Sequence, residues 1–233
     1  MTDFHLPQST IDMLHALGVQ PERALEVPAP PGAPLRRGSE LQALVEDLLR
    51  LAERRIGPRD HNFALVQVDF ESSDNPRIVL PYGRNEALIH LTRGAAHDGR
   101  RLIFQLSHEV FHLVSPTRLA VNILEEGLAT EFSLVCCRLH GYAVADAYIN
   151  LVDYRLALAG VRCLRQFEPE LDARCAEIRA AGVKLGCAAA DYLASVWTEA
   201  PAPLVAALAM PFSTIRTYRN DLRRYVGECR PGE

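Results

Sequence analysis

Two histidines and a glutamate at a fixed spacing carry the strongest chemical signal in this chain. Residues 104–114 read FQLSHEVFHLV and contain His108-Glu109-x-x-His112. Positions four apart lie on one face of a helix, so both imidazoles can offer a ring nitrogen to one metal ion. Glu109 lies one residue further round, where its carboxylate can reach a metal-bound water without binding the metal. The pattern predicts a zinc site in which His108 and His112 are ligands and Glu109 is the catalytic base.

The residues around the motif predict a buried helix. The flanking positions are apolar nearly all round, as in a helix enclosed by a core: Leu102, Ile103, Phe104, Leu106, Val110, Phe111, Leu113 and Val114. Burying two imidazoles and a carboxylate without partners is costly, and a metal ion would supply those partners. The competing interpretation is a half-exposed helix whose histidines and glutamate are solvated.

A second segment, NILEEGLATEF at residues 122–132, extends the signal. His108-Glu109-x-x-His112 followed by Glu126-Gly127-Leu128-Ala129 resembles the gluzincin group of zinc metallopeptidases. In that group a glutamate on a second helix, often followed by Gly or Ala, completes the metal site. The resemblance covers about residues 85–140. It implies one Zn²⁺ per chain with Glu126 as the third ligand. It also implies a compact zincin fold and hydrolysis of a peptide or protein substrate.

Three glutamates compete for the place of the third ligand. Glu126 matches the family pattern, because Gly127 and Ala129 would allow two helices to approach closely. Glu125 lies about 100° away on an α-helix and is expected to point aside. Glu131 lies about 140° from Glu126, so it is expected to support a ligand histidine through a hydrogen bond and not to bind the metal.

The resemblance also implies a side chain that shares the negative charge developing on the substrate oxygen. Tyr142, Tyr154 and Tyr192 are the candidates, and their spacing does not choose among them. An extended substrate is expected to pair with a sheet edge, for which the segment around residues 77–92 is the best candidate.

The elements that must position these residues predict a mostly helical α+β fold. An N-terminal segment, residues 1–37, contains a short helix to about residue 17 and a Pro-rich linker at 27–34. A zincin-like core, residues 38–140, contains a helix at 39–55, strands at 63–70, 77–81 and 86–92, the motif helix at about 99–114 and the glutamate helix at about 118–139. A helical region, residues 141–233, contains helices at 143–167, 171–197, 202–209 and 213–226.

Composition excludes several other classes of protein. The chain has 233 residues, a net charge of −4, 48% hydrophobic and 23% charged residues, as expected of a globular protein that binds neither nucleic acid nor an anionic membrane. No apolar run is long enough for a membrane span. No secretory signal precedes the first helix, so a cytoplasmic location is expected. In that location the cysteines are expected to be free. The alternative to a peptidase is a regulatory or scaffold protein that keeps the fold and a metal site.

Overall fold

The computed structural model describes residues 39–70, 75–144, 149, 151–217, 219–220 and 222–223. The helix expected before residue 17 and the Pro-rich linker therefore lie outside the described residues. The elements are α3 (Ser39–Ile56), β1 (Ala64–Asp69), β2 (Arg77–Val79), β3 (Glu86–His90), η1 (Arg93–Ala96), α4 (Gly99–Leu113), α5 (Ile123–Leu139), α6 (Val152–Phe167), α7 (Leu171–Ala180), η3 (Leu185–Cys187), α8 (Ala190–Val196), α9 (Ala202–Leu208) and η4 (Phe212–Thr214). The fold is α+β and mostly helical, as predicted.

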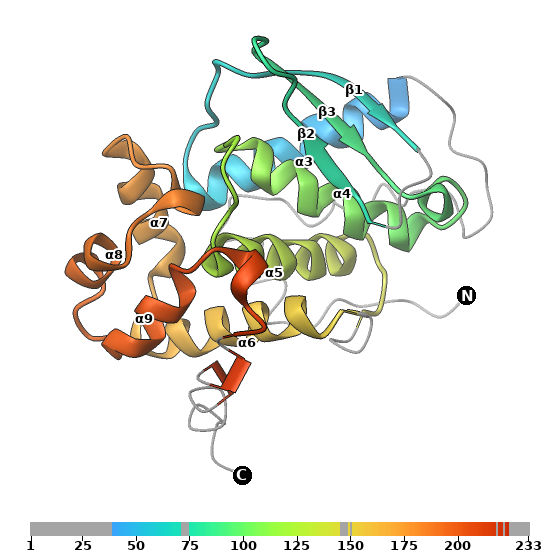
Figure 1. The fold of residues 1–233 in the computed structure, drawn as a ribbon. Coiled ribbons are helices and arrows are strands. Elements are labelled where there is room, and N and C mark those ends of the chain that lie inside the picture. Colours follow the sequence, from blue (N-terminus) through green and yellow to red (C-terminus); the bar gives the residue numbers. More distant parts are fainter. Residues whose placement is uncertain are drawn as a thin grey trace.

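A small sheet lies over layers of helices (Figure 1). Its strand order is β1-β3-β2, with β1 parallel and β2 antiparallel to β3, so β2 is an edge strand. Helices α3 and α4 lie beneath the sheet, α5 packs on α4, and α6 packs on α5. The motif helix is therefore held between the sheet and the glutamate helix.

Polar caps set where the two central helices begin. The carboxylate of Asp98 accepts a hydrogen bond from the Arg101 backbone N–H at the start of α4. The side chain of Asn122 accepts one from the Glu125 N–H at the start of α5. Both are standard helix caps. The glutamate helix thus begins five residues after the earliest predicted start at 118, because the chain bends through Ser115-Pro116-Thr117 and reaches its cap only at Asn122.

The helical region after residue 140 is more broken than the sequence pattern predicted. The helix expected over 171–197 is α7, η3 and α8. It breaks because Gly182 has φ +81°, a left-handed conformation that ends α7, and Val183 N–H donates to the Ile178 carbonyl at 3.2 Å. The helix expected over 143–167 is represented by α6, which begins at Val152, and part of its expected start lies outside the described residues. The turn η4 occupies the start of the helix expected over 213–226, much of which also lies outside the described residues.

One hydrophobic core joins the two predicted regions of the described chain. It includes Leu48 of α3, Leu106 of α4, Leu128 of α5, Val161 of α6 and Leu204 of α9, all at most 1% exposed. The predicted boundary at residue 140 lies just after α5, but packing continues across it. The residues that hold the site in place are therefore drawn from both regions.

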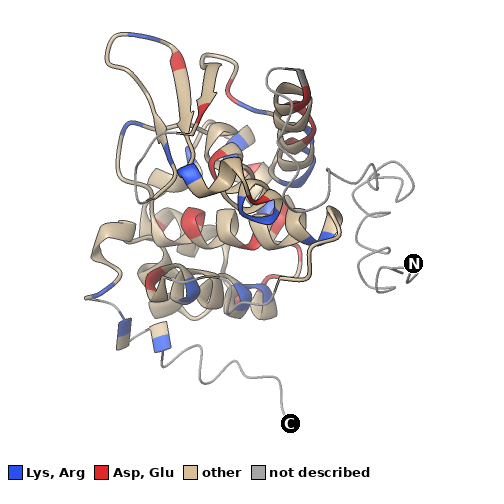
Figure 2. Ribbon diagram, turned by 90° about the vertical axis from the view of Figure 1, so that its right-hand side faces the viewer, with Lys and Arg blue, Asp and Glu red and all other residues tan. Residues whose placement is uncertain are grey.

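Charged residues are dispersed over the described surface. Figure 2 shows blue and red segments interspersed along the helices. Among the described helices, none has the length and apolar character needed to cross a membrane.

Cys136, Cys137, Cys175 and Cys187 are free, as expected, whereas Cys163 is disulfide-bonded.

Glu131 belongs to a part-buried ion-pair network and not to the motif histidines. Its carboxylate pairs with Arg55 of α3 and accepts from Arg165 Nη2 of α6 at 2.8 Å, and Arg55 Nε also reaches Asp172 of α7 at 2.8 Å. Burial by itself raises the pKa of Glu131, but the two arginines outweigh burial and lower that pKa to about 2. The expected hydrogen bond from Glu131 to a ligand histidine is therefore wrong; the network as a whole ties four helices together.

Glu131→Ala is expected to destabilise the fold without disturbing the histidines. Removing one partner of a buried ion pair leaves uncompensated charge, so the free energy of unfolding should fall by about 3–5 kcal/mol. Because the folded pKa is below the usual 4.5, the contribution of Glu131 is present above pH 4.5 and is lost as the pH falls toward about 2. Urea unfolding at pH 7 and at acid pH measures both effects. The exposed pair Arg174–Glu177 provides the control, since Glu177→Ala should leave the free energy of unfolding nearly unchanged.

Candidate metal centre

Three donor atoms from two helices converge on one point. His108 Nε2 lies 3.2 Å from His112 Nε2, and Glu126 Oε2 lies 3.1 Å from the first and 3.7 Å from the second. His108 and Glu126 are 6% and 8% exposed. Within the part of the chain that the structure describes, these three residues form the one group of His, Cys, Asp and Glu side chains arranged to hold a metal ion. The two histidines and Glu126 thus meet as the sequence predicted.

The separations of the donor atoms fit a small metal ion. Nitrogen or oxygen ligands about 2.0–2.1 Å from a tetrahedral zinc are separated from one another by about 3.3 Å. The three separations here, 3.1, 3.2 and 3.7 Å, bracket that value. Two imidazole nitrogens and a carboxylate oxygen facing one another also need a proton or a cation between them, because their lone pairs repel. The cluster is a candidate metal site on both counts.

The short connection between the helices is what brings Glu126 to the histidines. His112 is the last residue but one of α4, and Glu126 lies in the first turn of α5. A loop of nine residues, 114–122, therefore needs only to reverse the chain for the two side chains to face each other. A spacing of thirteen residues between His112 and Glu126 is sufficient because both side chains lie next to the turn.

The charges of the cluster are strongly coupled. Burial alone would lower the pKa of His112, but the carboxylates of Glu126 and Glu125 outweigh it and raise that pKa well above its usual value. Burial alone would raise the pKa of Glu126, but His112 and His108 lower it. The site thus stabilises a positive charge beside Glu126, which is the charge a metal ion would supply.

Glu109 lies beside the cluster and against the sheet edge. It is 4% exposed, and its carboxylate accepts a hydrogen bond from the Ile78 backbone N–H of the edge strand β2. Burial raises the pKa of Glu109, although His108 and His112 oppose the change. A carboxylate with a raised pKa is a better proton acceptor near neutral pH than an ordinary glutamate. The carboxylate that the motif predicted as the base thus lies buried beside the cluster.

Glu125 does not point aside, contrary to the sequence-based expectation. Its Oε1 lies 2.7 Å from His112 Nδ1, the ring nitrogen opposite the one that faces the cluster. The residue is 2% exposed. The angle between Glu125 and Glu126 on α5 does not decide this contact, because α4 runs alongside the start of α5. The two neighbouring glutamates therefore reach opposite sides of the His112 imidazole. The carboxylate expected beside a histidine at Glu131 is supplied by Glu125.

Small residues after Glu126 serve a helix contact other than the predicted one. A Cβ on Gly127 would lie 2.5 Å from the Ala157 carbonyl oxygen and 2.6 Å from Val161 Cγ2, both on α6. Gly127 therefore lets α5 approach α6. Tyr154 precedes Ala157 by three residues, so it lies on the same face of α6, one turn closer to the N-terminus.

Tyr154 is the candidate tyrosine that reaches the cluster. Its ring lies 5.5 Å from the ring of His108 and 4.8 Å from that of Phe212, in the turn η4. Burial first, and then the carboxylates of Glu126 and Glu109, raise the pKa of Tyr154 above its usual value. The phenol therefore stays protonated at neutral pH and can donate a hydrogen bond.

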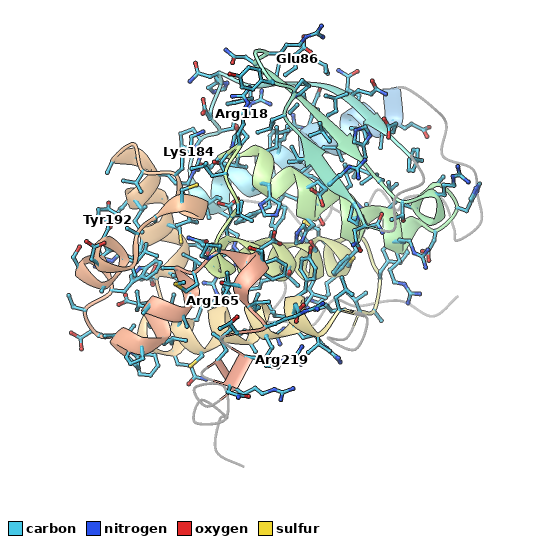
Figure 3. All side chains as sticks on the ribbon, viewed as in Figure 1. Glu86, Arg118, Arg165, Lys184, Tyr192 and Arg219 are labelled. Atoms are coloured by element: carbon cyan, nitrogen blue, oxygen red, sulfur yellow. The ribbon has the colours of Figure 1, made fainter. Side chains whose placement is uncertain are left out.

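The other two tyrosines lie elsewhere. The hydroxyl of Tyr142 lies against Gly99, at the end of α4 opposite to His112, where a Cβ on that glycine would be 2.3 Å from the hydroxyl oxygen. Tyr192 lies on α8 at the outer edge of the molecule (Figure 3). Only tertiary structure separates the three, because the discriminating contact is between Tyr154 of α6 and His108 of α4.

A large groove of the described chain is remote from the cluster. A groove of about 1600 Å³ runs between α3 and the edge strand β1, lined by residues that include Val45, Leu49, Val66 and Phe70. None of the metal-cluster residues lines it. Among the described residues that line the groove, no His, Cys, Asp and Glu side chains converge as they do at the cluster.

Comparisons with protein-family models, with curated proteins and with solved structures give no match to this chain. The class of the protein is therefore argued from the residues of the site and their geometry.

Proposed function

We propose that the protein is a zinc-dependent peptidase of the gluzincin type. The observation that carries the proposal is the convergence of His108 Nε2, His112 Nε2 and Glu126 Oε2 within 4.8 Å of one another, beside the buried carboxylate of Glu109. A catalytic zinc site has three protein ligands and leaves a fourth position for water, and the described residues supply three. Glu109 is the remaining acid that the mechanism needs.

Zinc is the metal that suits this donor set best. Two imidazole nitrogens and one carboxylate oxygen favour a borderline ion over Ca²⁺ or Mg²⁺, which prefer oxygen ligands. Bound zinc would supply a water of lowered pKa and would polarise the substrate carbonyl. His108, His112 and Glu126 would hold it, with one ion per chain.

The residues around the ligands would carry the proton transfers and the charge. Glu109 accepts the proton of the attacking water and passes it to the leaving amine. Burial raises the pKa of Glu109, which favours acceptance of a proton by its carboxylate. Tyr154, kept neutral by burial and by the nearby carboxylates, donates a hydrogen bond to the developing oxyanion.

The edge strand β2 is the place where an extended substrate would lie. It pairs with β3 on one side only, and a peptide added as a strand on the other side would take over the Ile78 N–H that now donates to Glu109. The Ile78 N–H already reaches Glu109, so a peptide along this edge would pass next to the catalytic base. Within the segment around residues 77–92 that was expected to pair with the substrate, the proposal therefore selects β2, residues 77–79.

Peptide hydrolysis in ¹⁸O-water tests the proposal. Zinc-loaded protein is incubated with a mixture of unstructured peptides, and new termini are identified by mass spectrometry. We expect new carboxyl termini that carry one ¹⁸O atom, since the attacking oxygen comes from water. Absence of cleavage across a diverse peptide mixture by protein shown to contain zinc would favour the alternative, a regulatory or scaffold protein with a metal site.

Tyr154→Phe is expected to lower kcat for peptide hydrolysis by about 10²–10³-fold while KM changes little. Loss of one donor to the oxyanion costs a reaction about that much, because the hydrogen bond is strongest in the transition state. Steady-state kinetics measures the effect. Tyr192→Phe is the control, and equal effects of the two substitutions would contradict the role given to Tyr154.

A further inference from the structure

The strongest unexplained feature next to the cluster is Glu125. One carboxylate oxygen, Oε1, lies 2.7 Å from His112 Nδ1. The other, Oε2, is buried and has no hydrogen-bond partner among the described atoms. Leaving a buried carboxylate oxygen unpaired costs free energy, so the position of Glu125 is not explained by stability alone. The arrangement suits a side chain that is selected for what it does to His112.

The turn η3, from the helical region after residue 140, holds Glu125 in that position. A Cβ on Gly186 would lie 2.3 Å from Glu125 Oε2 and 2.9 Å from its Cδ. The glycine therefore lets η3 lie directly against the carboxylate and limits its movement away from His112. The φ angle of Gly186 is not positive, so the backbone does not require a glycine at this position. A glycine is needed because a side chain would collide with Glu125.

The same turn fixes the helix that carries Glu125. Asn122, the cap of α5, donates two hydrogen bonds to η3: its backbone N–H donates to the Gly186 carbonyl and its side-chain amide donates to the Leu185 carbonyl, each at 2.8 Å. Its side-chain oxygen accepts from the Glu125 N–H at 2.9 Å. The start of α5 and η3 are therefore tied directly to each other.

We propose that Glu125 is a positioning residue that orients His112 for metal binding, and that Gly186 of η3 is the contact that keeps Glu125 in place. A carboxylate on Nδ1 fixes the tautomer with a free Nε2 lone pair, aims that lone pair at the cluster and raises the basicity of the imidazole. The inference rests on the proposed metal site and assigns a functional role to a turn more than 60 residues beyond the motif.

Zinc affinity, measured by competition with a chelator, tests the role of Glu125. Glu125→Ala should weaken zinc binding by about 10–100-fold, the usual cost of removing a hydrogen-bond partner of a ligand histidine. Glu125→Gln keeps the shape and an accepting oxygen, so it should lose less. Ser133→Ala is the matched control: Ser133 is a buried polar residue of the same helix whose hydroxyl donates to the Ala129 carbonyl, and its removal should leave zinc affinity unchanged.

A double-mutant cycle tests the role of Gly186. Gly186→Ala should weaken zinc binding about as much as Glu125→Ala, because the new methyl group displaces the carboxylate. In the Glu125→Ala background the methyl group has nothing to displace, so the double variant should bind zinc within about twofold of Glu125→Ala alone. Independent, multiplying losses would overturn the proposed contact.

A spectroscopic measurement separates positioning from general damage. In cobalt-loaded protein the Nδ1–H proton of His112 should give a paramagnetically shifted NMR signal that exchanges slowly with water, because Glu125 shields it. Glu125→Ala should speed that exchange, and thermal unfolding of the metal-free variants shows whether they fold.

If the wild-type chain binds zinc and Glu125→Ala binds it with the same affinity, this inference alone is overturned. A wild-type chain that binds no zinc would overturn the proposed function and this inference together.

Discussion

Glu109→Gln should leave zinc bound and lower the rate of peptide hydrolysis by about 10²–10⁴-fold. The amide keeps the size of the carboxylate but cannot accept the proton of the attacking water, and general acid–base catalysis contributes that much to a rate. Zinc content by elemental analysis and kcat/KM on one cleaved peptide measure the two halves of the expectation. The variant keeps both histidines and the carboxylate of Glu126, which hold the metal.

Two other outcomes for this variant would be informative. Loss of zinc would show that Glu109 is a ligand and that the division of roles among the motif residues is wrong. Retention of full activity would show that the proton is taken elsewhere. A matched control is Glu53→Gln, a partly buried glutamate of α3 outside the cluster, which should change neither zinc content nor rate.

Glu126→Ala and His108→Ala should each abolish measurable zinc binding. Each removes one of three donor atoms from a site in which the donors lie 3.1–3.7 Å apart. The loss should exceed the 10–100-fold cost of removing an outer hydrogen-bond partner. Chelator competition measures the affinity, and the metal content of the purified protein gives an independent reading.

The adjacent glutamates give this experiment its internal controls. Glu125→Ala should retain weakened binding, because it contacts only the far nitrogen of His112. Glu131→Ala should retain full affinity once folded, because its carboxylate contacts Arg55 and Arg165. If Glu131→Ala were the variant that empties the site, the assignment of Glu126 as a ligand would be wrong, and the helix pairing of α4 with α5 would need revision.

The sequence by itself determined the parts of the site that depend on local periodicity. His108 and His112 share a face because helix geometry places residues four apart together, and the apolar flanks indicated that this helix is buried. The family pattern predicted Glu126. Its short distance from the histidines follows from the loop of residues 114–122, which joins the end of α4 to the start of α5. The main strands and the motif helix were also predictable, because each shows a strong local pattern of apolar residues.

Tertiary structure alone decided which side chains surround those ligands. Glu125 and Glu131 are both acidic residues on one helix, and only the packing of α4, α3 and α6 around that helix decides that one contacts a histidine and the other two arginines. Tyr154 was chosen over Tyr142 and Tyr192 by the close approach of α6 at Gly127. Gly186 has no local signal at all, since its importance depends on a side chain 61 positions earlier in the chain. Helical periodicity fixes the direction of a side chain from its own axis, but the identity of its neighbours depends on how the axes pack, which no single segment encodes.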